Sequence, residues 1–390
     1  GTTSASRRRA TFRPALLEPR LSGANLNNMK GAVAAGHPAT AEAGARILEA
    51  GGNAVDACVA AGFVSWVVES PLTGPGAGGF MLVHRASDHS DRLLDFFVAL
   101  PGRGLDGHAA AAMDEIEVPF DAHTTQLFRI GGASCAVPGS VAGLGEAHRL
   151  YGRLPWEELV APAAEIARDG IELNPPQAFL HSILDVALRA EDEGRRVYGE
   201  RGPLAGGDRL VQSDLANTLD LLAREGAAAF YRGPLARAIS EAVRERGGLV
   251  SETDLAEYRV IRRRPVRVQY HGHEFVSNPP PSSGGVLIGL GLKHLEEPGR
   301  AGTADAVLRL AHVMELQARA RQRRLSRKLL EAGGTTHVSV LDADGNAASL
   351  SASTGAGSGV VVPGTGIHLN NMLGGELDLA INDPRPGQRL

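Results

Sequence analysis

The chain has 390 residues, of which 43% are hydrophobic and 22% charged, and its formal net charge is −4. This composition is typical of a globular protein, and the length is compatible with one large layered domain. The weakly acidic balance and an aromatic content of only 4% argue against a nucleic-acid-binding protein. No apolar run reaches the roughly 18 residues of a membrane span. Cys58 and Cys135 lie in apolar surroundings without a metal-binding spacing and are expected to be small core residues.

The N-terminal part begins with a polar segment and continues with two predicted helices. Residues 1–30 are rich in turn formers, which predicts a flexible arm. No apolar stretch follows their basic residues, so we expect a cytoplasmic protein without a secretory signal. Residues 39–50 consist of helix formers and end at Gly51-Gly52, a C-terminal stop signal. Asn53 then begins a run of small and apolar residues, which predicts a helix buried on most sides.

The middle of the chain is predicted to be helical and its end rich in strands. Two helices are expected in residues 140–170 and two more in residues 212–248. Residues 266–278 alternate with period two around a glycine, which predicts a hairpin. A short apolar helix and a long Arg-rich helix over residues 305–330 precede a second hairpin at residues 336–353. This order indicates a layered α/β protein with mixed sheets.

Four short patterns have a functional and a plainer interpretation. Residues 74–79 satisfy G-x-G-x-x-G, but a strand follows them instead of a helix, so we expect a tight turn with close backbone packing. Residues 342–346 resemble a calcium loop, yet their glycine is fourth and not sixth, which favours a hairpin turn. His271 and His273 lack the H-E-x-x-H pattern of a metal site. The cation-rich run 319–328 has no interleaved aromatic residues and is interpreted as a solvated helix face.

The stretch GGTTHVSVLDADGN, residues 333–346, places two threonines at the start of a predicted strand, directly behind two glycines. A threonine hydroxyl is a poor nucleophile unless a base takes its proton. If the peptide bond before Thr335 is cut, the freed α-amine lies on the same residue, and its pKa of about 7.7–8.0 suits a general base. The glycines would let the hydroxyl reach the carbonyl that precedes it. A Thr-Thr pair alone supports this role only weakly.

The chain resembles the γ-glutamyltransferase family of N-terminal-nucleophile (Ntn) hydrolases in seven blocks that follow the family's order. They cover roughly residues 31–315 and 335–371. The blocks are GAVAAGHPATAEAGARILEAGGNAVDACVAA, ESPLTGPGAGGFML, AVPGSVAGLGEAHRLYGRLPWEELVAPAAEIARDG, LVQSDLANTLDLLAREGAAAFYRGPLA, GGLVSETDLAEYRV, NPPPSSGGVLIGL, and TTHVSVLDADGN with the later GSGVVVPGTGIHLNN.

The resemblance implies an α/β (α+β) fold, the four-layer αββα sandwich with mixed or antiparallel central sheets. It also implies self-cleavage between Gly334 and Thr335, after which Thr335 is nucleophile and general base. Ser353 falls where the family places a second hydroxyl that orients the nucleophile. The implied reaction is attack on a small-molecule amide or γ-glutamyl-like substrate, followed by transfer of the acyl group to water or an amine. It needs no cofactor and no metal.

Several positions that the resemblance assigns to substrate binding depart from the family pattern. Phe97 stands where the family's D-F-R-E stretch has the arginine that binds the substrate carboxylate. Losing a bidentate clamp of this kind disfavours a glutamyl substrate. Met372 follows Asn371 where the family has a polar side chain, and Gly355 replaces an asparagine. These three positions, with Thr336 and Asn371, are the candidate substrate-binding residues, and they favour a less polar acyl group than γ-glutamyl.

The resemblance divides the chain into the arm 1–30, a large-subunit-like region 31–334, and the start of a small-subunit-like region, 335–390. The family's later Ser-Ser and Gly-Gly pairs, which help to build its oxyanion hole, have no counterpart before Leu390. Besides a γ-glutamyltransferase-like enzyme, three alternatives stay open: an acylase for non-glutamyl amides, a biosynthetic hydrolase of natural products, and a truncated, unprocessed scaffold. A homo-oligomer is also left open, while nucleic-acid and membrane partners are not expected.

Overall fold

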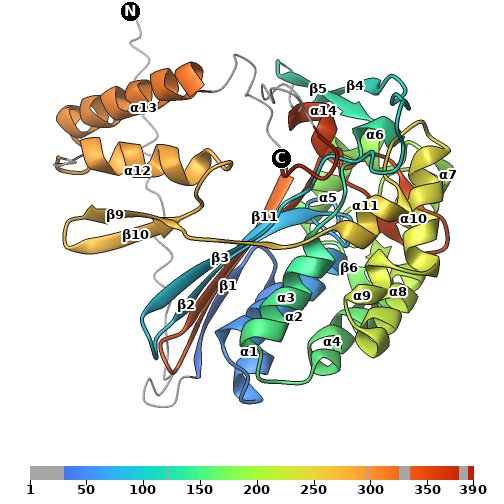
Figure 1. Cartoon of the computed structure of the whole chain (residues 1–390), viewed down its shortest axis with the longest axis horizontal. Helices are drawn as coiled ribbons and strands as arrows, with labels where there is room; N and C mark the ends of the chain where they lie inside the picture. Colours follow the sequence, from blue (N-terminus) through green and yellow to red (C-terminus); the bar gives the residue numbers. More distant parts are fainter. Residues whose placement is uncertain (1–29, 121–122, 296, 298, 325–333, 377–384) are drawn as a thin grey trace, which may run out of the picture.

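The computed structural model describes residues 30–120, 123–295, 297, 299–324, 334–376 and 385–390. Its centre is a six-stranded sheet in the order β1-β11-β12-β2-β3-β8 (Figure 1), in which every neighbouring pair is antiparallel. The strands are β1 (Gly31–Ala35), β2 (Gly78–Arg85), β3 (Ser90–Phe96), β8 (Ile261–Arg263), β11 (Gly334–Asp342) and β12 (Ala347–Gly355). The C-terminal strands β11 and β12 thus lie between the N-terminal strands β1 and β2.

Two helices predicted from the sequence cover one face of this sheet. They are α1 (Pro38–Glu49) and α2 (Ala54–Val68). Asn53 caps α2: its side chain accepts hydrogen bonds from the amides of Val55 and Asp56, and the Asp56 carboxylate accepts one from the Asn53 amide. Every residue of α2 is buried, as its small and apolar composition predicted.

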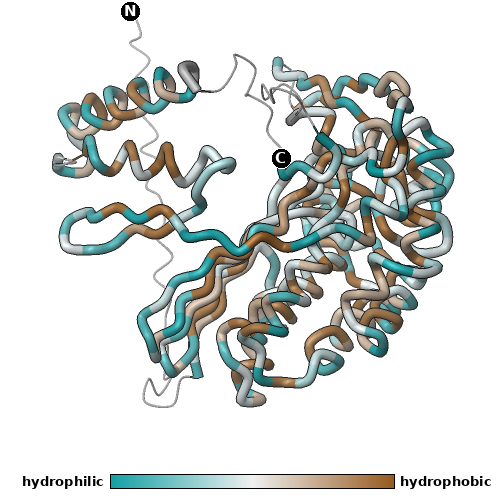
Figure 2. The backbone as a smooth tube through the Cα atoms, viewed as in Figure 1, coloured by the Kyte–Doolittle hydropathy of each residue, from teal (hydrophilic) through white to brown (hydrophobic). Residues whose placement is uncertain are grey.

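The strands of the sheet alternate between a buried and an open face. In β11, Val338 and Val340 are buried against the helices, while His337 and Ser339 are exposed on the other side. Figure 2 shows the hydrophobic residues that run along these central strands. Because side chains alternate with period two, the register of β11 decides which face each residue of the T-T-H motif occupies.

The remaining helices and small sheets surround this core. Four helices match the predictions for residues 140–170 and 212–248: α3 (Ser140–Tyr151), α4 (Trp156–Asp169), α8 (Ser213–Glu225) and α10 (Pro234–Arg244). The smaller elements of the fold are β4 (Asp114–Pro119), β5 (Thr125–Ile130), η2 (Gly132–Ser134), β6 (Ile171–Glu172), α5 (Pro175–Ile183), α6 (Asp185–Leu188), α7 (Asp192–Tyr198), β7 (Arg209–Leu210), α9 (Ala228–Tyr231), α11 (Glu252–Glu257), β13 (Val361–Val362), β14 (Ile367–His368) and α14 (Met372–Glu376).

A hairpin and two helices lie on the side of the sheet away from α1 and α4 (Figure 1). The hairpin, β9 (Val266–Tyr270) and β10 (His273–Ser277), is followed by α12 (Gly284–His294) and α13 (Ala304–Arg324). An ion pair of 2.5 Å between Arg267 and Asp91 joins the hairpin to β3. The layers therefore follow the order helices, sheet, hairpin, helices, in agreement with the expected α+β sandwich. The predicted end of α13, residues 325–330, lies outside the described residues, as does the arm 1–29.

Other predictions from the sequence can be compared with the fold. Residues 74–79 form a turn into β2, and a side chain at Gly76 or Gly79 would overlap the backbone of a neighbouring segment, which confirms close backbone packing. The turn at residues 342–346 closes the β11–β12 hairpin, where the Asp342 carboxylate accepts the amides of Asp344 and Asn346. Cys58 and Cys135 are buried free thiols, and burial raises the pKa of each to about 12. Of the described helices, none combines the length and the apolar character required to cross a membrane.

Candidate active site

Thr335 is exposed and lies at the start of β11, the strand next to β1 in the six-stranded sheet. The register shows an irregularity there: Gly334 pairs with Gly355 and Thr336 pairs with Ala352. One residue of β11, Thr335, therefore stands opposite two residues of β12, as in a β-bulge. Bulges occur next to active sites because they redirect a side chain and end regular pairing.

Ser353 is one of the two residues that face Thr335 across this bulge. It is only 8% exposed, and its Oγ accepts a hydrogen bond from the Gly355 amide at 2.9 Å. The structure therefore brings together the two hydroxyl residues that the sequence predicted as nucleophile and orienting partner. The assignment of these roles stays a prediction.

Thr336 points to the opposite face from its neighbour. It is 2% exposed, and its hydroxyl donates to Oε2 of Glu69, whose Oε1 accepts from Thr40 at 2.7 Å. Glu69 is itself buried, directly after α2. The Thr336 hydroxyl thus anchors β11 to the helical layer, and its predicted part in substrate binding stays a prediction.

Gly355 and Asn371 are positioned by each other. Gly355 has φ +72°, in the left-handed region, and a Cβ at this residue would overlap Oδ1 of Asn371. Asn371 is 6% exposed; its Oδ1 accepts the Ala356 amide at 2.9 Å and its Nδ2 donates to the Arg129 carbonyl at 3.1 Å. The side-chain amide of Asn371 therefore fills the space that a residue other than glycine would need at position 355.

Gly355→Asn is expected to destabilise the protein, although asparagine is the residue that the sequence resemblance leads us to expect at this position. Asparagine tolerates a positive φ, but its Cβ would collide with Asn371, so a cost of about 1–3 kcal/mol is expected. Urea unfolding monitored by circular dichroism measures this change. The exposed Gly345, at φ +85° with only a 3.4 Å contact to Ala86, offers a matched control, since Gly345→Asn should cost less. Equal effects at both positions would contradict the role of Asn371.

Apolar residues surround Phe97, the position at which the sequence resemblance predicted a change in substrate binding. Phe97 stacks on Phe80 with ring centroids 5.4 Å apart and an interplanar angle of 10°. Phe80 pairs with Ser351, which pairs with His337, so this row crosses the open face beside Thr335. Phe97 also packs on a buried cluster that contains Val98, Leu100, Ala136, Met372, Leu373 and Leu390. Met372 is 7% exposed, and α14 carries it into that cluster.

A buried ion pair fixes the backbone beneath Phe97. Asp95 is fully buried and accepts hydrogen bonds from Arg263 at 2.6 Å and from the Phe97 amide at 3.0 Å. Arg389 lies 3.3 Å from the same carboxylate, and its guanidinium also donates to the Phe97 carbonyl. No sequence pattern indicated Arg389, which lies 294 residues from Asp95.

His337 forms a polar cluster with serines on the open face of the sheet. Its Nδ1 lies 2.8 Å from Ser351 Oγ, and its Nε2 lies 3.0 Å from Ser339 Oγ and 3.3 Å from Ser349 Oγ. Burial lowers the pKa of His337, which favours the neutral ring. The cluster holds the side chain two residues after Thr335 in one orientation.

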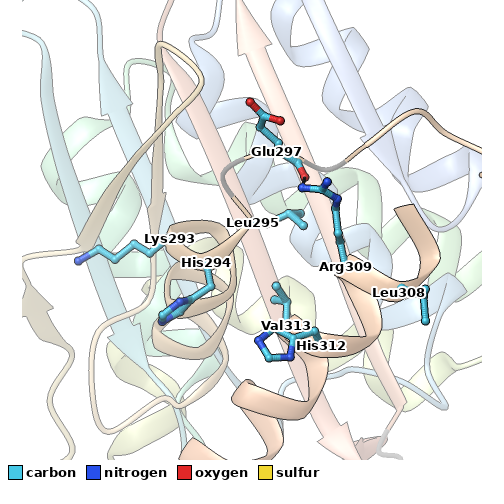
Figure 3. Close-up of a pocket in the computed structure, with 8 residues that line it drawn as sticks. All are labelled: Lys293, His294, Leu295, Glu297, Leu308, Arg309, His312 and Val313. Carbon is cyan, nitrogen blue, oxygen red and sulfur yellow. Dashed lines mark hydrogen bonds between the residues drawn. The ribbon is translucent and has the colours of Figure 1, made fainter. Parts of the chain in front are cut away.

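A groove of about 750 Å³ lies elsewhere, between α12 and α13 (Figure 3). Its lining includes Lys293, His294 and His312, and the Arg309 guanidinium lies next to the Glu297 carbonyl, to which it donates at 3.2 Å. Thr335, Ser353 and the Phe97 cluster do not line it. Among the described residues, no group of three or more histidine, cysteine or acidic side chains is placed to hold a metal ion.

The succession of helices, sheet, hairpin and helices, with an exposed threonine at the start of β11, is the arrangement expected of an Ntn hydrolase. The profile of the family described as Gamma-glutamyltranspeptidase matches residues 40–329 and 312–389. The chain therefore belongs to the γ-glutamyltranspeptidase family, whose members are enzymes of the hydrolase and transferase classes. This confirms the family resemblance inferred from the seven sequence blocks.

Known proteins similar to this chain include both acylases and glutathione hydrolases. The Acylase ACY 1 proenzyme of Pseudomonas sp. strain SE83 is 34% identical over 93% of this chain and 71% of its own length. The Glutathione hydrolase proenzyme of Escherichia coli K12 is 30% identical over 88% of this chain and 66% of its own length. Among solved structures, cephalosporin acylase from Bacillus halodurans superposes with a TM-score of 0.75, at 25% identity over 100% of this chain and 75% of the acylase chain. The γ-glutamyltranspeptidase of Helicobacter pylori gives a TM-score of 0.67, at 30% identity over 76% of this chain and 84% of its own.

Proposed function

We propose that this chain cuts itself before Thr335 and then uses Thr335 to hydrolyse or transfer small amide substrates. The observation that carries the proposal is the exposed Thr335, directly behind Gly334 and opposite Ser353 at the bulged end of β11. In the self-cleavage, the Thr335 hydroxyl attacks the Gly334 carbonyl carbon and the C–N bond breaks, so the acyl group moves from nitrogen to oxygen. Water then hydrolyses this ester, which leaves a carboxylate on Gly334 and an α-amine on Thr335.

Turnover repeats the same chemistry on a substrate. The α-amine takes the hydroxyl proton, the oxygen attacks the substrate amide, and the departing amine leaves with a proton. The resulting ester on Thr335 is then resolved by water or by a second amine. One residue therefore serves as nucleophile and base in both halves of the reaction, with Ser353 as the orienting hydroxyl.

The acyl group that this site favours is less polar than γ-glutamyl. In this chain the carboxylate-binding arginine of the family is replaced by Phe97, which is stacked on Phe80 and packed on the cluster around Met372. A buried or half-buried apolar surface gains nothing from a charged substrate group, whose desolvation is costly. The acylases among the similar proteins support a non-glutamyl substrate.

Mass spectrometry of the purified protein tests the self-cleavage. We expect two polypeptides, the second of which begins at Thr335. A chain that stays uncut in purified, folded material would contradict the proposal and would favour the unprocessed scaffold. Because this measurement requires no substrate, it is independent of the inferred acyl group.

The substrate preference is expected to depend on Phe97. Phenylbutanoyl-p-nitroanilide should be hydrolysed faster than γ-glutamyl-p-nitroanilide, which has the same leaving group. Phe97→Arg should shift the ratio of the two kcat/KM values toward the glutamyl compound by about tenfold or more, because a charge-assisted hydrogen bond is worth about 1.5–3 kcal/mol. Phe97→Leu is the matched control and should keep the preference for the phenylbutanoyl compound. Robust γ-glutamyl turnover by the unchanged protein would contradict the inferred pocket.

A further inference from the structure

Glu69 is a buried carboxylate beneath the start of β11, and its orientation is fixed from several sides. Only 6% of it is exposed. Its two oxygens accept hydrogen bonds from the hydroxyls of Thr40 and Thr336, and its amide donates to the Ser65 carbonyl at 2.8 Å. A Cβ at Gly36 would lie 2.7 Å from Oε2, so the glycine lets the loop between β1 and α1 close over the carboxylate.

This carboxylate has no cationic partner in the part of the chain that the structure describes; the groups that bind its oxygens are neutral hydroxyls. His37 lies close enough to respond to its charge: burial lowers the pKa of His37, and Glu69 partly offsets that change. His37 Nδ1 accepts the Ala39 amide at 3.1 Å, as an unprotonated ring nitrogen does. A buried carboxylate without a counter-ion is costly, so its retention requires an explanation.

Cleavage before Thr335 would create a cation one residue away from the Thr336 hydroxyl that Glu69 binds. We propose that Glu69 is the positioning residue of the nucleophile: it holds Thr336 from beneath and is the counter-ion of the α-ammonium group that cleavage creates on Thr335. The inference rests on the proposed function, because the uncut chain has an uncharged amide at this position.

The proposal predicts the direction in which the α-amine titrates. A nearby opposite charge favours the charged form, so the pKa of the Thr335 α-amine should lie above its ordinary range of about 7.7–8.0. Desolvation would lower this pKa, but only weakly, since Thr335 is exposed. Among the described residues, His37 lies beside Glu69 and His337 lies on the open face of β11; burial lowers the pKa of both, so they add little positive charge near neutral pH.

The direction in which the pH–rate profile shifts follows from the amine's role as a base. The amine acts only when it is unprotonated, so a raised pKa moves the acid limb of the pH–rate profile to higher pH. Removing the charge at residue 69 should move that limb back to lower pH. A purely structural role of Glu69 would lower the rate without moving the limb.

Competitive labelling with limiting acetic anhydride tests the proposal without any substrate. Only unprotonated amines react, so the labelling of the Thr335 N-terminal peptide across a pH series, measured by mass spectrometry, gives the α-amine pKa. We expect a value above 8 for the unchanged protein and a decrease of about one unit in Glu69→Gln. The exposed Glu42 on α1 provides a control of equal charge, and Glu42→Gln should leave the value unchanged.

Two results would overturn the inference: an unchanged protein whose α-amine titrates at or below the ordinary range, or a Glu69→Gln variant that titrates like the unchanged protein. In both cases the Thr335 N-terminus is present, so the proposed function stands. Lack of that N-terminus in the unchanged protein would instead overturn the proposed function.

A second pair of variants tests the positioning half of the proposal should Glu69→Gln fail to fold. Thr336→Ser keeps the hydroxyl that Glu69 binds and is the reference for the rate of self-cleavage. Thr336→Val keeps the shape and removes the hydroxyl, and it should be cut several-fold more slowly in timed samples from cell-free synthesis. Equal rates for the two variants would overturn the positioning role.

Discussion

The Thr335→Ala variant is expected to remain a single uncut chain and to lose amide turnover by about 10⁴-fold or more. Self-cleavage and amide turnover both use the Thr335 oxygen. Its removal therefore stops self-cleavage and leaves amide turnover without a nucleophile or an α-amine. Mass spectrometry and initial-rate assays on the same preparation measure the two losses together. The fold should persist, because Thr335 is exposed and contributes little buried surface.

Two other variants test whether the cleavage depends on the hydroxyl of Thr335 in particular or on any hydroxyl of this face. Thr335→Ser keeps the oxygen and should still be cut, while Ser339→Ala removes a hydroxyl from the same open face of β11 and should leave the cleavage site unchanged. A polypeptide that begins at residue 335 in preparations of Thr335→Ala would show that another group performs the cleavage.

The sequence predicts those parts of the fold whose signals are local. Asn53 with Asp56 forms the capping box that starts α2, and the small residues that follow place this helix in the core. The hairpin of β11 and β12 is likewise encoded by alternation around a short turn. The position of Thr335 at the start of that hairpin could therefore be predicted without any knowledge of its partners.

Elements and contacts that depend on remote partners were missed. β1 has the sequence GAVAA, which lacks a clear alternation, and its pairing with β11 exists only in the folded chain. Glu69 is 267 residues from Thr336, and Arg389 is 294 residues from Asp95. No spacing rule within a window of ten or twenty residues finds such pairs. The one available signal was the acidic residue itself, directly after the apolar helix α2.

Asp95→Asn is expected to destabilise the protein by about 3–5 kcal/mol, the usual cost of removing one partner of a buried ion pair. Asparagine retains the acceptor for the Phe97 amide and the volume of the side chain. It removes the charge that pairs with Arg263 and with Arg389, whose side chain is only 6% exposed. Guanidinium chloride would screen the pair, so urea unfolding monitored by circular dichroism is the suitable measurement.

The surface pair of Asp220 with Arg168 provides the comparison for this cost. Both side chains are well exposed, at 38% and 49%, so Asp220→Asn should change the free energy of unfolding by less than about 1 kcal/mol. If the two variants unfold at the same urea concentration, the ion pair beneath Phe97 does not stabilise the fold.

Loss of the Asp95 charge should also alter the substrate site, because Arg389 bonds the Phe97 carbonyl while Asp95 accepts the Phe97 amide. Phe97 would then be held less firmly against Phe80, and the ring stack would loosen. KM for an apolar acyl substrate should rise more than kcat falls, since the variant leaves Thr335 and Ser353 untouched. A fall in kcat at constant KM would place the effect of Asp95 on the nucleophile instead of on the acyl-binding surface.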